Sequence, residues 1–377
     1  MIKKPIYFDY AASTPLRKEV AEYYSELLLG SHGNPSSSHS FGRKAKVVLE
    51  SSRKEIAKLM NCHSAEIIFT SGGTEANNTA LVMALRDLKV KRIISSPIEH
   101  HAVLHAAKMW CKAFSAEFYT LSVDAQGRID LAELERELQK EGPALVSLMH
   151  GNNEIGNLND LQAIGDLAHQ HNSYFHSDTV QTVGHYPLNL GALPIDFAAA
   201  SAHKFHGPKA VGFLYFSQKL RVQALISGGA QQRGLRGGTE NIFQVGAMTK
   251  ALSLAYQNLA AERQHILEIK TYFLAQIAEK MPQVYTNGLS GNLEGSLYTV
   301  ASISFPMQKD SGMLLFNLDL QGFALSGGSA CSSGSVQSSH VIAAIDANHQ
   351  DTVLRVSFGK DSKKEEIDLL IAYLLSI

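Results

Sequence analysis

Between about Ile67 and Phe216, short apolar runs of strand length alternate with amphipathic stretches of helical period. The clearest helical stretches are Leu131–Leu138 and Leu161–Ala168. Because parallel strands need a crossover element between them, this alternation favours a mainly parallel sheet with helices on both faces. The predicted fold class is therefore α/β. The strands are expected at Ile67–Phe69, Arg92–Ser95, Ala144–Leu148 and Val211–Phe216.

A smaller unit is expected after this region. From Asn241 to about Met281 the chain is helical in pattern and free of proline, so it can lead out of the large domain. The predicted division is a large domain over residues 15–255 and a small α/β domain made of residues 1–14 and 256–377. The elements expected in the small domain are strands at Val300–Phe305 and Val353–Phe358, a helix near Leu314 and a closing helix from Lys364.

Charge and cysteine content exclude several classes of protein. The 377 residues include 34 Lys and Arg against 35 Asp and Glu, so no long-range field would recruit nucleic acid or a membrane surface. Three scattered cysteines do not make a disulfide framework or a zinc site, and the sixteen histidines show no paired ligand spacing, so no metal is expected. With neither a secretory leader nor an apolar run of roughly 18 residues, we expect a cytoplasmic protein.

An acid and a lysine each follow an apolar run. Asp178 follows Tyr174-Phe175, and Ser201-Ala202-His203-Lys204 follows Ile195–Ala200, with room between them for a helical stretch and a return strand. This spacing predicts a carboxylate and an amine at one edge of a parallel sheet, where α/β ligand sites form. Pyridoxal 5′-phosphate needs such a pair, a lysine for the Schiff base and an acid for the pyridinium nitrogen. Alone, either residue is as well explained by a helix cap or a solvated loop.

Further polar segments follow neighbouring strands. Ser71–Asn78 opens a helix with small residues that would let backbone N–H groups approach a phosphate, although a plain N-cap explains it equally well. His100 could move protons over a cofactor ring, and the loop His150–Gly156 supplies amides at the same edge. Arg233–Asn241 forms either an anion nest or a flexible turn. Arg355, within a predicted strand, is a candidate for binding a substrate carboxylate, with an exposed strand face as the alternative.

Cys331 lies in the Ser/Gly-rich stretch Ser326–Ser335, which predicts a mobile surface loop and an accessible thiol. Its position in the small domain would let it approach a cofactor at the domain boundary. Cys62 and Cys111 flank apolar segments and are expected to be structural.

Taken together, these motifs resemble the cysteine desulfurases, fold-type I enzymes of the class-V aminotransferase family that take sulfur from L-cysteine. The resemblance runs almost end to end. It begins at Tyr7–Pro15 and Gly33–Ser37, and it continues through the motifs described above to Ser329-Ala330-Cys331 and Arg355.

The resemblance implies a role for each site residue. Lys204 would hold pyridoxal 5′-phosphate as a Schiff base, His100 would stack on the ring and transfer protons, and Cys331 would attack the substrate sulfur to leave alanine and a persulfide. Asp178 would pair with the ring nitrogen, and Asn153 and Gln181 would address the hydroxyl side of the ring. Arg355 and Asn34 would bind the substrate. The phosphate ligands would be Gly73, Thr74, Ser201 and His203, with Thr239 from the second subunit of a homodimer.

The resemblance leaves the sulfur acceptor open between an iron–sulfur scaffold or sulfur relay protein and a route to tRNA thiolation. A selenocysteine lyase or a cysteine/cystine lyase on the same fold is the nearest alternative, since its chemistry could use the same residues. A non-catalytic interaction protein should have lost the lysine, the acid or the loop cysteine, and this chain has all three.

Overall fold

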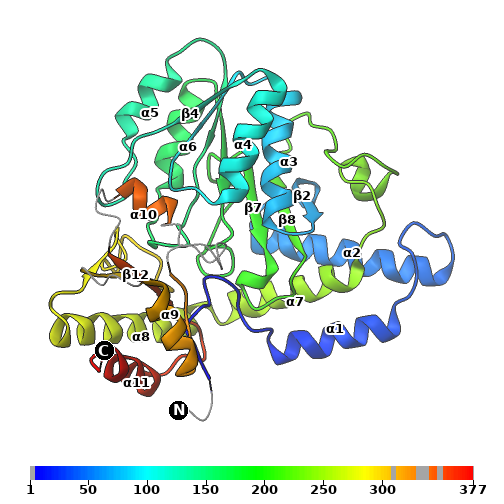
Figure 1. Cartoon of the computed structure of the whole chain (residues 1–377). Coiled ribbons are helices and arrows are strands. Elements are labelled where there is room, and N and C mark those ends of the chain that lie inside the picture. The colour runs from blue at the N-terminus through cyan, green and yellow to red at the C-terminus, as the bar shows by residue number, and fades with distance from the viewer. Residues whose placement is uncertain (1–4, 307–310, 328–338, 346–350, 377) are drawn as a thin grey trace.

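The structure is a computed structural model that describes residues 5–306, 311–327, 339–345 and 351–376. A seven-stranded sheet lies at its centre, in the order β2-β8-β7-β6-β5-β3-β4 (Figure 1). Only β8 runs antiparallel to its neighbours, which confirms the predicted mainly parallel α/β sheet. The strands are β2 Ile67–Thr70, β3 Arg92–Ser95, β4 Glu117–Thr120, β5 Ala144–Ser147, β6 Tyr174–Asp178, β7 Phe197–Ser201 and β8 Gly212–Phe216.

Helices cover both faces of this sheet, because successive strand side chains point to opposite sides. Ile68, Ala199 and Leu214 pack in one core with helices α3 and α4, whereas Ile67 and Ala200 pack in a second core on the other face. The helices of this part are α1 Lys18–Gly30, α2 Ser40–Leu59, α3 Gly73–Arg86, α4 His101–Phe114, α5 Leu131–Leu138, α6 Leu161–Gln170 and α7 Ile242–Gln257, with short 3₁₀ turns η1 Ser64–Glu66, η2 Ala202–Lys204 and η3 Gln231–Gly234.

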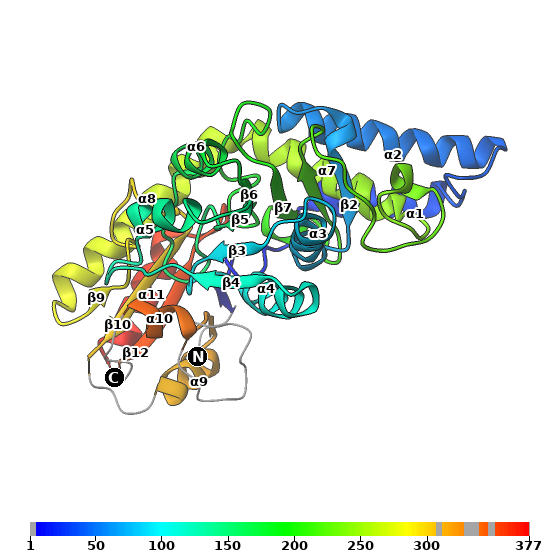
Figure 2. The ribbon, with the colours of Figure 1, turned by 90° about the horizontal axis from the view of Figure 1, so that it is seen from above.

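A second sheet and a separate core form beside the first (Figure 2). Its strands pair antiparallel in the order β12-β10-β9, and the N-terminal strand β1 pairs in parallel with β11. The N-terminal residues Ile6 and Phe8 belong to this core. The division into a large domain over residues 15–255 and a small domain made of residues 1–14 and 256–377 remains a proposal. The elements are β1 Ile6–Tyr7, α8 Leu259–Lys280, β9 Tyr285–Thr286, β10 Val300–Phe305, α9 Ser311–Leu320, β11 Phe323–Ala324, α10 His340–Ile345, β12 Thr352–Ser357 and α11 Lys364–Leu374.

Two details of the predicted elements were wrong. The helical stretch from Asn241 to Met281 is two helices, because Asn258 leaves helical geometry at ψ 6° and its side chain bonds the carbonyl of Leu254 at 2.8 Å. The chain between Asp178 and Phe197 contains turns in place of a helix and a return strand. Gly184 has a φ of +81°, and Pro187 and Pro194 interrupt the rest, so no helix can form. Strands β6 and β7 are nevertheless adjacent and parallel.

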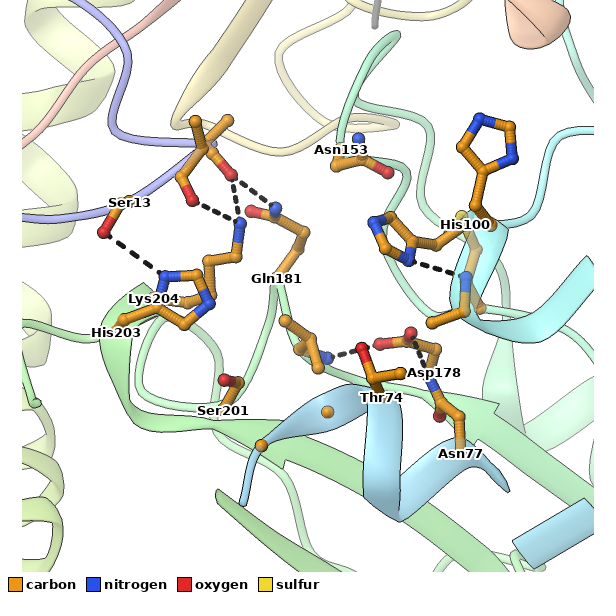
Figure 3. Close-up of a pocket in the computed structure, with 18 of the residues that line it drawn as sticks. Ser13, Thr74, Asn77, His100, Asn153, Asp178, Gln181, Ser201, His203 and Lys204 are labelled. Atoms are coloured by element: carbon orange, nitrogen blue, oxygen red, sulfur yellow. Dashed lines mark hydrogen bonds between the residues drawn. The ribbon is translucent and has the colours of Figure 1, made fainter. Parts of the chain in front are cut away.

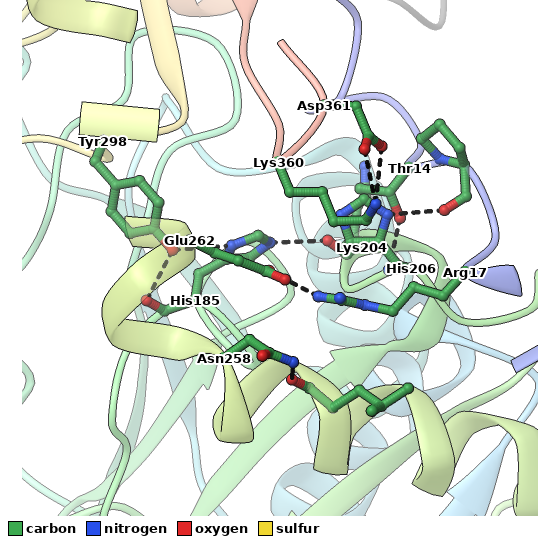
Figure 4. Close-up of polar contacts among 12 residues, drawn as sticks. Thr14, Arg17, His185, Lys204, His206, Asn258, Glu262, Tyr298, Lys360 and Asp361 are labelled. Carbon is green, nitrogen blue, oxygen red and sulfur yellow. Dashed lines mark hydrogen bonds and ion pairs between the residues drawn. The ribbon is translucent and has the colours of Figure 1, made fainter. Parts of the chain in front are cut away.

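Polar contacts join the two parts behind Lys204 (Figure 4). Arg17 pairs with Glu262 of α8 at 2.7 Å, with side chains 7% and 21% exposed. His185 Nε2 lies 2.9 Å from the carbonyl oxygen of Lys204, and the hydroxyl of Tyr298 donates to the carbonyl of His185 at 3.1 Å. The lysine backbone is therefore held by residues from both cores.

Candidate active site

A cavity of about 550 Å³ opens at the carboxyl ends of the parallel strands (Figure 3). Lys204 and His203 lie on one side, His100 and Asn153 lie across from them, and Asp178 lies below His100, next to Asn77. Loops after β2, β3, β5, β6 and β7 contribute its walls, together with residues of the N-terminal segment, α10 and β12. The predicted convergence of polar loops at one sheet edge is therefore found.

Lys204 projects into this cavity from η2, the single turn that follows β7. Its Nζ donates hydrogen bonds to the carbonyl oxygens of Ala11 and Ala12, at 2.5 and 2.9 Å. Gln181 Nε2 also donates to the oxygen of Ala11, at 2.9 Å. The N-terminal segment thus orients the amine, a contact that no sequence motif around the lysine reveals.

Asp178 is the last residue of β6 and is only 7% exposed. Both of its carboxylate oxygens accept hydrogen bonds: Oδ2 from Asn77 Nδ2 at 2.7 Å, and Oδ1 from the amide of Val180 at 3.0 Å. Donors on both oxygens stabilise the charged form of a buried acid. The carboxylate therefore meets the requirement for pairing with a protonated ring nitrogen.

The start of α3 forms the part of the cavity suited to an anion. Gly72 has a φ of +142°, a backbone conformation that residues with a side chain rarely adopt. A Cβ on Gly73 would lie only 2.8 Å from Val180 Cγ2, so a larger residue would not fit there without a shift. Thr74 also lines the cavity, so amide groups, a hydroxyl and the positive end of the helix face one space. Ser201 and His203 border the same cavity, and burial lowers the pKa of His203 to about 4, which leaves its imidazole neutral near pH 7.

His100 caps α4, with its Nδ1 accepting a hydrogen bond from the amide of Ala102 at 3.1 Å. This bond leaves Nε2 as the protonated nitrogen of the neutral ring. Burial lowers the pKa of His100, while the charge of Asp178 opposes that change. A largely neutral imidazole beside the cavity is suited to exchanging protons near neutral pH.

Arg355 reaches the cavity from β12 although its side chain is 1% exposed. Its Nη2 pairs with Asp9 at 2.8 Å and its Nη1 donates to the carbonyl of Asn153 at 3.0 Å. Within the described residues its buried Nε has no hydrogen-bond partner. A guanidinium with remaining donor capacity at the cavity wall can bind a small carboxylate.

Two of the predicted site residues that the structure describes do not line this cavity, and a third, Cys331, lies outside the described residues. Asn34 lies in the loop between α1 and α2, is exposed, and uses its side chain to bind the amide of Ser36 at 2.9 Å. Thr239 is exposed in the loop after η3 and does not line the cavity of its own chain. The other two cysteines are poor nucleophiles, because burial raises the pKa of Cys62 to about 12 and that of Cys111 to about 11.

Sequence reasoning missed several buried groups around the cavity. Glu99 is 1% exposed, burial raises its pKa well above the usual range, and its Oε1 accepts a hydrogen bond from the amide of Met149 at 2.6 Å. Burial also raises the pKa of Glu154 to about 7, and Ser339 donates a short hydrogen bond to it. The only sequence signal was that both glutamates adjoin predicted site residues. Within the described residues, no cluster of acidic, histidine or cysteine side chains could hold a metal ion.

Comparison with known proteins agrees with this geometry. The family model described as aminotransferase class-V matches residues 6–370, and the chain therefore belongs to that family. A protein of Dictyoglomus turgidum named cysteine desulfurase IscS is 40% identical, over 99% of this chain and 94% of its own length. A Pseudomonas putida protein of the same name is 38% identical, over 97% and 91%.

Comparison with solved structures also finds similar proteins over nearly the whole chain. One titled NifS-like protein is 31% identical, covers 99% of this chain and 98% of its own, and superposes with a TM-score of 0.89. Another, titled SspA in complex with cysteine, is 28% identical, covers 94% and 99%, and has a TM-score of 0.77. The fold is thus that of the fold-type I enzymes.

The cofactor of this family is pyridoxal 5′-phosphate, and the residues present fit it. Lys204 supplies the amine, Asp178 a carboxylate for the ring nitrogen, and the start of α3 an anion site in one cavity. When bound, the cofactor withdraws electrons from the substrate's α-carbon.

No described helix is both long and apolar enough to cross a membrane.

Proposed function

We propose that this protein is a cysteine desulfurase that converts L-cysteine to L-alanine and leaves the sulfur as a persulfide on Cys331. The observation that carries the proposal is the placement of Lys204, Asp178, His100 and Arg355 around one cavity in a chain 40% identical to a cysteine desulfurase.

Each side chain has a task that its position supports. Arg355 binds the carboxylate of cysteine, which takes the place of Asp9 or joins it at the guanidinium. Lys204 anchors the cofactor, and His100 lies across the cavity and takes part in proton transfer. Gly73, Thr74, Ser201 and His203 bind the phosphate. Asn153 and Gln181 orient the ring.

In the sulfur-transfer step, the sulfur of the substrate cysteine moves to the thiol of Cys331. The thiolate of Cys331 attacks the sulfur of the substrate, the carbon–sulfur bond breaks, and its electron pair stays with carbon, which takes up a proton. The products are L-alanine and a Cys331 persulfide, so the sulfur is oxidised as the carbon is reduced. A thiolate is required for this attack, and an unperturbed cysteine of pKa about 8.5 is only a few per cent ionised at neutral pH.

Two variants test the activity. Lys204→Ala should no longer hold the cofactor covalently, and Cys331→Ser should keep the cofactor but release almost no alanine. Mass spectrometry after brief exposure to L-cysteine should find one added sulfur on the Cys331 peptide. Sulfur on Cys62 or Cys111 instead, or full turnover by Cys331→Ser, refutes the mechanism. Faster turnover of selenocysteine than of cysteine would favour a selenocysteine lyase.

We also propose a homodimer in which Thr239 completes the phosphate site of the partner subunit. Thr239 is exposed and outside its own cavity, and large apolar side chains are exposed on α1 and α2. These are Leu28 at 48%, Leu29 at 88%, Phe41 at 51% and Val47 at 66%. Such a patch requires a covering surface, and a second copy with Thr239 at its edge would supply one. Asn34, in the loop between α1 and α2, would likewise reach the substrate in the cavity of the partner subunit.

Mixed dimers test the arrangement. Thr239→Ala alone should weaken cofactor retention modestly, because one neutral hydrogen bond contributes about 0.5–1.5 kcal/mol. Each mixed dimer of this variant with a Lys204→Ala subunit should regain tight retention in one of its two sites, since that site combines Lys204 with an intact Thr239 from the partner. A fully active monomer contradicts the proposal.

The product persulfide implies a protein acceptor for the sulfur, either an iron–sulfur scaffold or a sulfur relay protein. The relatives named IscS support the assignment to iron–sulfur cluster assembly, with tRNA thiolation as the second route. The proposed compartment is the cytoplasm, where a reactive thiol stays reduced.

A further inference from the structure

Four polar side chains, three from the large sheet and one from helix α3, form a series of hydrogen bonds below the cavity. Asp178 accepts from Asn77 at 2.7 Å, Asn77 Oδ1 lies 3.1 Å from His176 Nε2, and His176 Nδ1 lies 2.8 Å from Ser147 Oγ. Asn77 and His176 are fully buried and Ser147 is 1% exposed. They come from α3, β6 and β5, and their side chains are shielded from bulk solvent.

The directions of these bonds follow from the carboxylate at one end. Asn77 must turn its NH₂ group toward Asp178, because its carbonyl oxygen would otherwise face a negative charge. Its carbonyl therefore faces His176, which must donate from Nε2. A neutral imidazole with a proton on Nε2 accepts at Nδ1, so the hydroxyl of Ser147 donates to it. Burial lowers the pKa of His176 to about 4, in agreement with a neutral ring.

We propose that Ser147, His176 and Asn77 are positioning residues that keep Asp178 an acceptor and so keep the proton on the ring nitrogen of the bound cofactor. Every donor in the series points toward the carboxylate, and aligned bonds in a dry interior reinforce one another. The inference rests on the proposed role of Asp178. It adds residues that act through Asp178 and that determine where a proton resides.

Among the described residues, no other charged group near Asp178 replaces the hydrogen bond that Asn77 donates to its carboxylate. Glu99 and His100 both respond to its charge, but neither is its hydrogen-bond partner in the described structure. Val180 supplies a backbone amide to the other oxygen, a donor that no side-chain substitution removes. Losing Asn77 therefore leaves one side of the carboxylate without a donor in a buried site. The proton of the ring nitrogen can then move to Asp178.

The test is nuclear magnetic resonance of the enzyme reconstituted with pyridoxal 5′-phosphate labelled with ¹⁵N in its ring, which reports ring protonation directly. A hydrogen bond to a charged group contributes enough for Asn77→Ala to shift the proton about 10- to 100-fold from the ring nitrogen toward Asp178. Ser147→Ala should shift it less, in the same direction. Asn78→Ala, which removes the neighbouring amide bonded to Trp110 and Thr74, is the matched control and should match wild type.

A double variant separates this role from a purely structural one. His176→Phe should shift the proton on its own, yet add nothing once Asn77→Ala is present, because its influence passes through Asn77. Wild-type ring protonation in Asn77→Ala and in His176→Phe overturns the inference, as does an additive effect in the double variant. If Asn77→Ala does not fold, wild-type protonation in Ser147→Ala and His176→Phe overturns it equally. A wild type that takes up no cofactor refutes the proposed function itself.

Discussion

Lys270 offers a prediction whose size can be worked out from the structure. It is fully buried on α8, where its Nζ donates to Ser296 Oγ and to the carbonyl of Leu297, both at 2.8 Å. Leu297 lies against Gly151, whose loop lines the active site, because a Cβ on Gly151 would lie 2.8 Å from Leu297 Cδ2. The hydrogen bonds of Lys270 therefore hold Leu297 against the loop that forms one wall of the cavity.

Burial lowers the pKa of Lys270 from its usual 10.5 to about 7. At about 1.4 kcal/mol per pH unit, the buried ammonium destabilises the folded protein by about 5 kcal/mol wherever the lysine is charged in both states, which is below pH 7. Between pH 7 and 10.5 the unfolded chain holds more protons than the folded one, so this cost declines as the pH rises. Above 10.5 it is gone.

Lys270→Met should therefore stabilise the protein at pH 7. At pH 7 the lysine is half charged in the folded protein, and the cost is about 4 kcal/mol. Removing this cost while losing two hydrogen bonds worth about 0.5–1.5 kcal/mol each leaves a gain of about 1–3 kcal/mol. The gain should fall by about 3 kcal/mol on going from pH 7 to pH 9.5, where little of the wild-type cost remains. At the higher pH the variant should be the less stable protein.

Urea unfolding of both proteins at several pH values measures this difference. Lys280→Met, an exposed lysine on the same helix, is the control and should show no pH-dependent difference from wild type. A Lys270→Met difference that stays constant between pH 7 and 9.5 would refute the reasoning, since it would mean that the buried lysine titrates as it does in water.

Three further variants address the site and its support. Asp178→Asn should retain the cofactor and lose at least about 100-fold in turnover, because an amide cannot stabilise a protonated ring; turnover within twofold of wild type would remove Asp178 from its role. Arg355→Lys should raise the KM for cysteine about 10-fold or more with a smaller change in kcat, since an ammonium cannot bind a carboxylate in bidentate fashion; steady-state kinetics would show an unchanged KM if the carboxylate binds elsewhere. Glu262→Ala should cost about 3–5 kcal/mol in the free energy of unfolding by leaving Arg17 buried and unpaired, and adding Arg17→Met should recover much of it; a cost below about 1 kcal/mol would show the pair to be solvated.

The sequence alone determined the parallel sheet and most of the residues around the cavity. Its strand runs and the polar residues directly after them sufficed, because the carboxyl ends of parallel strands meet at one edge whatever lies between them. Asp178, Lys204, Thr74 and His100 are brought together for this reason. That holds even though the connection between Asp178 and Phe197 was predicted as a helical stretch and a return strand and is a series of turns.

Only the tertiary structure decided which groups support those residues. Ala11 holds Lys204 across 193 positions of the chain, and Asn77 meets Asp178 across 101. No local pattern marks such pairs, because a backbone carbonyl has no sequence signature and a buried asparagine on a helix looks like any other polar residue. The same holds for Lys270, a lysine in a helix of weak amphipathic pattern, whose burial depends on two oxygens 26 and 27 residues further along. Hydrogen bonds in a dry interior are specified by the packing of whole elements, and that packing exists only in the folded chain.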